Sequence, residues 1–186
     1  KQHPPEQLPG SQISNAVVDA FSPGKLLDEL VSTIQSYVVM DKEQADAAAL
    51  WIAMTWFIKV IEVAPLALIT APEKACGKSQ LLTIFGYLVA APLPVANLSA
   101  SFVFRSIEIS CPTILIDEAD TFLRENSELK GIINAGHTRA NAYVGRTESN
   151  GNGVFTPKLF SVWCAKAMAG IGIEKHLPAA TISRAI

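Results

Sequence analysis

"LALITAPEKACGKSQLLTIFGYL", residues 66–88, joins a short apolar run to a loop of small and turn-forming residues and then to an apolar helical segment. This order predicts a buried strand, a loop, and a helix that begins at Ser79. Backbone N–H groups of such a loop and of the first helical turn converge on one place, where they bind phosphate. Gly77 would let the backbone come close, Lys78 would reach the β- and γ-phosphates, and Ser79 would place its hydroxyl on Mg²⁺.

A second motif, "TILIDEAD" at 113–120, has the pattern of a buried strand that ends in two carboxylates. Ligands of α/β proteins bind at the carboxyl ends of the parallel strands, so we expect Asp117 and Glu118 at the same sheet edge as the loop before Ser79. Asp117 would hold the hydration shell of Mg²⁺, and Glu118 would orient and deprotonate the attacking water. An exposed acidic turn does not explain why both motifs follow strands. The two motifs together therefore predict a nucleotide site.

The rest of the chain predicts an α/β fold. Strand-length apolar runs are expected at 66–70, 94–97, 113–117 and 158–164, and amphipathic segments at about 79–91, 99–109 and 121–136. Strands that alternate with helices imply parallel βαβ units and a mostly parallel sheet covered on both faces. Before them, 23–61 has the periodicity of two helices. We expect a linker or arm at 1–13, an N-terminal helical segment packed on the core at 14–63, and the core itself at 64–186.

Composition excludes several classes of protein. The 186 residues are 49% hydrophobic and 17% charged, which is typical of a globular chain and not of a disordered one. A net charge of −2 gives no overall cationic field, so any nucleic-acid contact must be local. The three cysteines have no metal-binding spacing and suit a reducing cytoplasm. The longest apolar run, 47–58, is too short to span a bilayer, which takes about 20 residues.

The motifs "PEKACGKS", "ILIDEAD" and "LPAATISRAI" resemble those of P-loop ATPases of the AAA+ and related additional-strand groups. Residues from about 24 to 186 are also similar to a bacterial and phage domain family of unassigned function, whose members sit beside primase-like or replication modules. The resemblance implies a three-layer αβα P-loop NTPase with strand order 5-1-4-3-2, binding ATP and Mg²⁺. It also implies a homo-oligomeric ring or filament, a helicase-like role on DNA, and an upstream domain in the same polypeptide. The last strand and any lid are expected beyond Ile186.

The loop departs from the usual pattern at two positions. Pro72 stands where the first glycine is usual, and Ala75 stands where another glycine is common. Proline fixes φ and removes an N–H group, and alanine disfavours positive φ, so we expect different torsions at the start of a working loop. The residues expected to contact the nucleotide are Glu73, Lys74, Ala75, Cys76, Gly77, Lys78, Ser79 and Gln80.

The resemblance assigns roles to two further residues. Arg184 in "LPAATISRAI" matches the arginine that acts in trans as a finger in a neighbouring subunit's site, while the alternative is a surface arginine paired with a carboxylate. A polar residue at the end of the strand between the two motif strands senses the γ-phosphate in these ATPases. Lys166, just beyond the run at 158–164, is the first candidate, and Ser161 is the second.

The stretch "NAGHTRANAYVGRTE", residues 134–148, predicts a hairpin built on "AYVGRT" that carries Arg139 and Arg146. Basic side chains on such a loop could contact the phosphates of a DNA strand. A solvated turn explains these residues equally well.

Three functions fit these motifs. The first is a Mg-dependent ATP hydrolase that acts as an oligomeric motor on DNA, in replication or mobile-element maintenance. The second is a nucleotide-gated scaffold that binds ATP with little turnover and tethers an upstream catalytic domain. Pro72 and Ala75 favour the scaffold, whereas Glu118 opposes it, since a pure binder needs no catalytic base. A small-molecule kinase is disfavoured because Glu118 and Arg184 suit water as the nucleophile.

Overall fold

The structure is a computed structural model that describes residues 22–71, 73, 76–96, 99–124, 126–149, 151, 153 and 155–186. The α-helices are α2 (Pro23–Tyr37), α3 (Lys42–Trp56), α4 (Lys78–Leu88), α5 (Ala100–Ser110), α6 (Ala119–Leu123), α7 (Ser127–Ala135) and α8 (Ala179–Ile182). The strands are β1 (Ala67–Thr70), β2 (Pro92–Val95), β3 (Thr113–Ile116), β4 (Tyr143–Ser149), β5 (Phe155–Ser161) and β6 (Lys166–Gly170). Two short 3₁₀ helices are η1 (Arg139–Asn141) and η2 (Ile173–His176). The expected arm at 1–13 lies outside the described residues.

The central sheet is parallel and has the order β1-β6-β3-β2. The last residues of the chain extend it beyond β1, where Ala185 forms a parallel bridge with Leu66. Ile186 continues this pairing, because its N–H donates to Leu66 O and its carbonyl accepts from Leu68 N–H, both at 2.9 Å. When the separate β4–β5 hairpin is left uncounted, the four strands follow the 1-4-3-2 part of the expected order, and residues 185–186 lie at the edge where the fifth strand is expected.

The expected strand at 158–164 is wrong. Most of that run belongs to β5, which pairs antiparallel with β4 in a two-stranded sheet of its own. The strand between β1 and β3 is instead β6, whose five residues are all buried. Its sequence "KAMAG" lacks the β-branched residues that favour strands, and it forms a strand because neighbours on both sides supply its hydrogen bonds.

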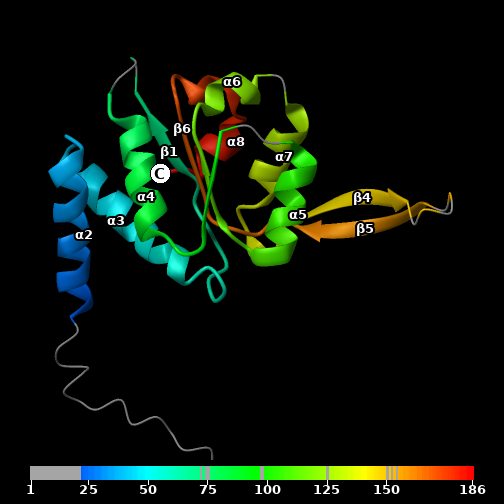
Figure 1. Ribbon diagram of the computed structural model, residues 1–186, viewed down its shortest axis with the longest axis horizontal. Coiled ribbons are helices and arrows are strands. Elements are labelled where there is room, and N and C mark those ends of the chain that lie inside the picture. The colour runs from blue at the N-terminus through cyan, green and yellow to red at the C-terminus, as the bar shows by residue number, and fades with distance from the viewer. Residues whose placement is uncertain are drawn as a thin grey trace, which may run out of the picture.

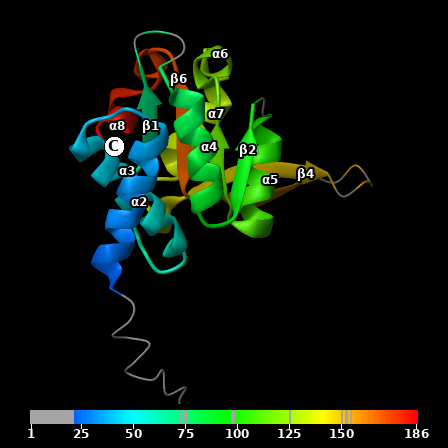
Figure 2. The same ribbon diagram turned by 60° about the vertical axis from the view of Figure 1, so that its left-hand side comes forward.

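Helices cover both faces of the sheet, and the α/β arrangement is compatible with a three-layer αβα fold. In Figures 1 and 2, α2, α3 and α4 lie on one side of the sheet, while α5, α7 and α8 lie on the other. Trp51 of α3 stacks on Phe85 of α4 with ring centroids 5.2 Å apart, and its Nε1 donates to Pro65 O at 2.9 Å. The predicted N-terminal helical pair therefore packs on the core. The helix expected at 121–136 divides into α6 and α7.

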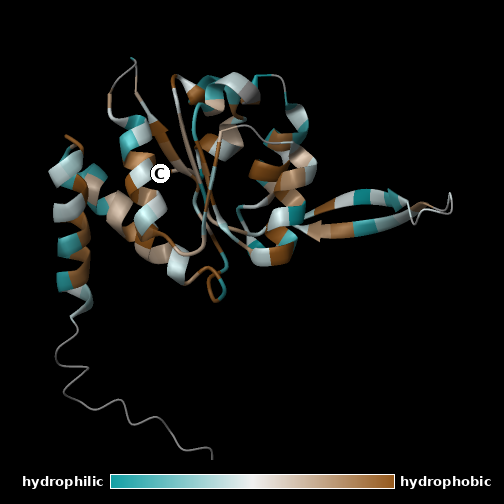
Figure 3. Ribbon diagram, in the orientation of Figure 1, coloured by the Kyte–Doolittle hydropathy of each residue, from teal (hydrophilic) through white to brown (hydrophobic). Residues whose placement is uncertain are grey.

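The β4–β5 hairpin extends away from the body of the molecule (Figure 1). Its base is held against α5, where the rings of Phe160 and Phe104 lie 4.7 Å apart. Exposure alternates along β4, where Val144, Arg146 and Glu148 are half-buried and the residues between them are exposed, and Figure 3 shows hydrophilic positions recurring along the strand. The hairpin predicted around "AYVGRT" is confirmed.

No helix in the described part of the chain is both long and apolar enough to cross a bilayer. Cys76, Cys111 and Cys164 are not joined in disulfides. Burial raises the pKa of the Cys111 and Cys164 thiols, so both are protonated at neutral pH.

Candidate functional site

The loop after β1 enters α4 through a left-handed glycine. Gly77 is the N-cap residue of α4 and has φ 75° and ψ 6°. Its carbonyl accepts the N–H of Leu81 at 2.9 Å and so begins the helix. A Cβ at this position would be strained by the positive φ and would lie 3.4 Å from Val38 Cγ1. Glycine therefore sets the start of α4 at the carboxyl end of β1, where the first N–H groups of the helix have no partner within it.

Lys78, the first residue of α4, is half-buried. Its Nζ donates to the carbonyl oxygen of Glu73 at 2.6 Å, which turns the side chain back toward the start of the loop. Among the other residues expected to contact the nucleotide, Cys76, Ser79 and Gln80 are exposed. Lys74 and Ala75 lie outside the described residues, as does Pro72, so the effect of Pro72 and Ala75 on the loop stays a prediction.

Ser79 and Asp117 line the same pocket, of about 460 Å³, at the carboxyl edge of the sheet. They follow different strands, β1 and β3, which are separated in the sheet by β6. Asp117 is fixed on the edge because its N–H donates to Val95 O at 3.2 Å and its Oδ1 accepts from Glu118 N–H at 2.9 Å. Ser79 and Asp117 therefore share a pocket, but Gly77 and Lys78 line a different one and Glu118 lines neither, so a single site formed by both motifs stays a prediction.

Glu118 is exposed and has φ 51° and ψ 37°, in the left-handed region. A non-glycine residue held in this region costs free energy, and such residues cluster at functional sites. The neighbouring Asp120 holds the turn in place, since its Oδ1 accepts from Ile171 N–H at 3.2 Å. A Cβ on Gly170 would lie 2.6 Å from the same oxygen, so the end of β6 approaches α6 more closely than a side chain permits. The exposed Glu118 thus lies in a turn that Asp120 ties to the residue after β6.

A second pocket, of about 300 Å³, lies on the other side of the loop. Gly77 and Lys78 line it together with Val38 and Met40 of the connection between α2 and α3, and with Gln44 of α3. Its volume is at the lower end of the range for small-molecule sites. The N-terminal helical pair therefore contributes directly to the surroundings of the loop.

Sequence reasoning missed the residues that follow β6. Thr70 Oγ1 donates to Glu174 Oε2 at 3.2 Å, and Lys175 lines a pocket with Thr70 and Ala71 beside the loop. Arg124 Nε lies 3.3 Å from His176 Nε2. These residues could have been identified from their position, because η2 follows the carboxyl end of the central strand β6. Expecting the strand at 158–164 concealed that position.

Lys166 is not at the carboxyl end of a strand, and its predicted role as a γ-phosphate sensor is wrong. It is the first residue of β6, paired with Ile114 near the start of β3. Asp117 comes three residues after Ile114, so Lys166 lies about 10 Å below the level of Asp117 at about 3.3 Å per residue. Its side chain is buried at 4% exposure, and its Nζ donates to Val162 O at 2.9 Å and to Cys164 O at 3.1 Å. Ser161, the second candidate, lies in the hairpin.

The absence of a side chain at Gly136, at the end of α7, leaves room for Lys166. A Cβ at Gly136 would lie 2.5 Å from the Val162 carbonyl oxygen and would collide with Lys166 Nζ. Gly136→Ala is therefore expected to lower the free energy of unfolding by about 1–3 kcal/mol, measured by chemical denaturation. Gly131→Ala is the matched control, because a Cβ on this α7 residue meets nothing within 4 Å and alanine favours the helix. Equal stability of the two variants would contradict the packing described here.

Arg184 lies in the turn between α8 and the edge residues 185–186, and its side chain is exposed. No ion pair of Arg184 is found among the described residues, so the surface-pair alternative has no support there. Because Ala185 pairs with the residue before β1, Arg184 lies at the amino end of the sheet, opposite the pocket of Ser79. Arg184 is therefore too far from Ser79 and Asp117 to act at the pocket of the same copy.

Arg139 and Arg146 are both engaged with the protein. Arg139 Nη1 donates to Lys59 O at 2.6 Å, and the same nitrogen lies 3.9 Å from Glu62 Oε1. Arg146 pairs with Glu128 of α7, and its guanidinium lies 5.1 Å from the centroid of the Phe104 ring. The contacts of Arg139 hold η1 against the body, and those of Arg146 hold the hairpin.

Comparison with known proteins adds no assignment. No protein-family model matches the chain, and no curated protein matches it significantly.

Proposed function

We propose that this chain binds ATP with Mg²⁺ at the loop before α4 and hydrolyses the γ-phosphate. The observation that carries the proposal is that Ser79 and Asp117, from two separated strands, line one pocket. A phosphate in the loop would meet the N–H groups at the start of α4, which favour an anion. Lys78 would exchange its contact with the Glu73 carbonyl for phosphate oxygens.

The side chains around the pocket fit the metal and the reaction. Ser79 Oγ and the Asp117 carboxylate are hard oxygen ligands, and Mg²⁺ binds to one or two carboxylates together with substrate phosphates. When bound, Mg²⁺ neutralises charge on the phosphates. The exposed carboxylate of Glu118, held on its left-handed turn, is placed to accept a proton from water. Asp120 and Ile171 keep this turn against the end of β6.

We further propose that the active form is an oligomer acting on DNA. Arg184 lies at the opposite end of the sheet from its own pocket and has no ion pair among the described residues, so a role as a finger requires a neighbouring copy. The projecting hairpin supplies a surface away from the nucleotide pocket (Figure 2). Arg139 and Arg146 would contribute to DNA binding only by giving up their present contacts.

One observation favours the alternative, a scaffold that binds ATP with little turnover and tethers an upstream domain. The end of β6 reads Gly170-Ile171-Gly172, so it carries no polar side chain where a γ-phosphate sensor is expected. The exposed carboxylate of Glu118 favours hydrolysis.

Two measurements test these alternatives in sequence. Calorimetric titration with ATP is expected to show binding with Mg²⁺ and much weaker binding with EDTA. Single-turnover hydrolysis, measured over a range of protein concentrations, is then expected to accelerate with concentration, because Arg184 acts between copies. Binding without hydrolysis at any concentration would favour the scaffold, and no binding would exclude both functions.

A further inference from the structure

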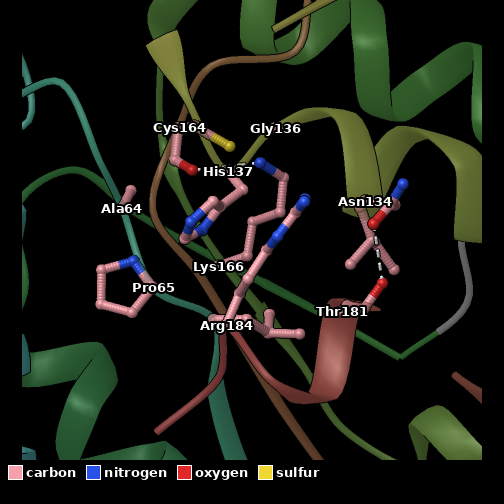
Figure 4. A pocket seen from close by; sticks show the side chains of 11 residues that line it. Ala64, Pro65, Asn134, Gly136, His137, Cys164, Lys166, Thr181 and Arg184 are labelled. Atoms are coloured by element: carbon pink, nitrogen blue, oxygen red, sulfur yellow. Dashed lines mark hydrogen bonds between the residues drawn. The ribbon is translucent and has the colours of Figure 1, made fainter. Parts of the chain in front are cut away.

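A small pocket lies at the amino end of the sheet, on the side opposite the proposed nucleotide site. Four segments meet there: the residues before β1, the end of α7, the start of β6 and the turn after α8. Its polar lining, drawn in Figure 4, consists of Asn134, His137, Cys164, Lys166, Thr181 and Arg184.

Lys166 supplies a buried cation to this pocket. Its side chain is 4% exposed, and its Nζ donates to the carbonyls of Val162 and Cys164. An ammonium group has three donors, so one remains after these two contacts. A charge this deeply buried is costly unless a partner compensates it, and backbone carbonyls carry only partial charges.

Arg184 supplies a second cation. In Figure 4 its side chain extends in the same direction as that of Lys166, and both line the pocket. No Asp or Glu lines the pocket, and within the described ranges neither cation has an ion-pair partner. Cys164 contributes no negative charge either, because burial raises the pKa of its thiol. Two like charges therefore share one small space without a counter-charge.

We propose that this pocket is a binding site for a compact oxyanion, a phosphate or carboxylate head group held between Arg184 and Lys166. The guanidinium fork of Arg184 suits the paired oxygens of either group. The pocket volume is about 20 Å³, on a scale where one water needs at least about 10–15 Å³, so the pocket admits about one oxygen of the head group and leaves the rest of the ligand outside. The site does not depend on the proposed ATPase activity.

Nuclear magnetic resonance titration of the full chain tests the site. Sodium phosphate and sodium acetate are added separately against sodium chloride at equal ionic strength, and the signals of His137, Thr181 and Ala185 are followed. We expect saturable shifts with at least one oxyanion and weaker, non-saturating changes with chloride. Arg184→Gln is expected to weaken the binding about tenfold or more, because it removes a charge-assisted contact. This variant is expected to keep the fold, since Arg184 is exposed.

Two controls separate this site from other effects. Lys25→Gln removes the same charge from the exposed surface of α2 and is expected to bind as the unchanged chain does. The amide signal of Gly77 reports phosphate binding in the loop before α4. Binding at the loop and binding at the pocket are therefore measured independently. The absence of saturable shifts at the pocket signals, an equal response to chloride, or unchanged affinity in Arg184→Gln would each overturn the proposal.

Discussion

Lys78→Ala is expected to abolish ATP hydrolysis, with turnover reduced at least about 100-fold and ATP affinity reduced about tenfold or more. The physical reason is that Lys78 is the cation at the start of α4, and its replacement leaves the phosphate charge to Mg²⁺ and the backbone N–H groups. The measurements are single-turnover hydrolysis and calorimetric titration with ATP and Mg²⁺.

The fold is expected to survive this change. Lys78 makes its observed hydrogen bond to the carbonyl of Glu73, so its loss costs about 1 kcal/mol of stability or less. Lys25→Ala, an exposed lysine of α2, is the matched control and should hydrolyse ATP normally. Undiminished turnover in Lys78→Ala would remove this loop as the catalytic site.

Glu118→Gln is expected to separate binding from chemistry. Glutamine keeps the size of the side chain but cannot accept the proton from water, so hydrolysis should fall by about 10²–10⁴-fold. ATP affinity should change little, because Lys78, Ser79 and the start of α4 remain intact. Rapid-quench kinetics at saturating ATP and Mg²⁺ measure the first quantity, and calorimetry measures the second.

The control for this variant is Glu29→Gln, which makes the same substitution on the exposed face of α2. A fall in ATP affinity as large as the fall in rate would show that Glu118 contributes to binding and not to proton transfer. Near-normal hydrolysis in Glu118→Gln would assign the base elsewhere, with Asp120 the nearest carboxylate along the chain that is not a proposed ligand of Mg²⁺.

The part of the fold that was predicted correctly rests on strong local signals. The runs that became β1 and β3 are apolar, of strand length and bounded by turn residues, and Gly77 marks the helix start. Asp117 was placed correctly because the position of a residue after a parallel strand determines the sheet edge at which it lies. The predicted meeting of Ser79 and Asp117 follows from the same rule.

The incorrect predictions for the strand at 158–164 and for Lys166 have the same cause. The segment 158–164 has more strand-favouring residues than "KAMAG", but its register is set by pairing with β4, and its exposed face makes it a hairpin. Because the strand was expected at 158–164, Lys166 was predicted at the carboxyl end of the sheet, whereas it lies at the amino end. The residues that follow β6 were not identified for the same reason.

The sequence by itself determined the alternation of strands and helices, the glycine at the start of α4 and the carboxylates after β3, because each depends on neighbours along the chain. Only the tertiary structure decided which run fills the gap between β1 and β3, and that Lys166 and Arg184 meet in one pocket at the amino end of the sheet. These features depend on contacts between segments far apart in the chain, where hydrogen-bond partners and space from other elements override local preference.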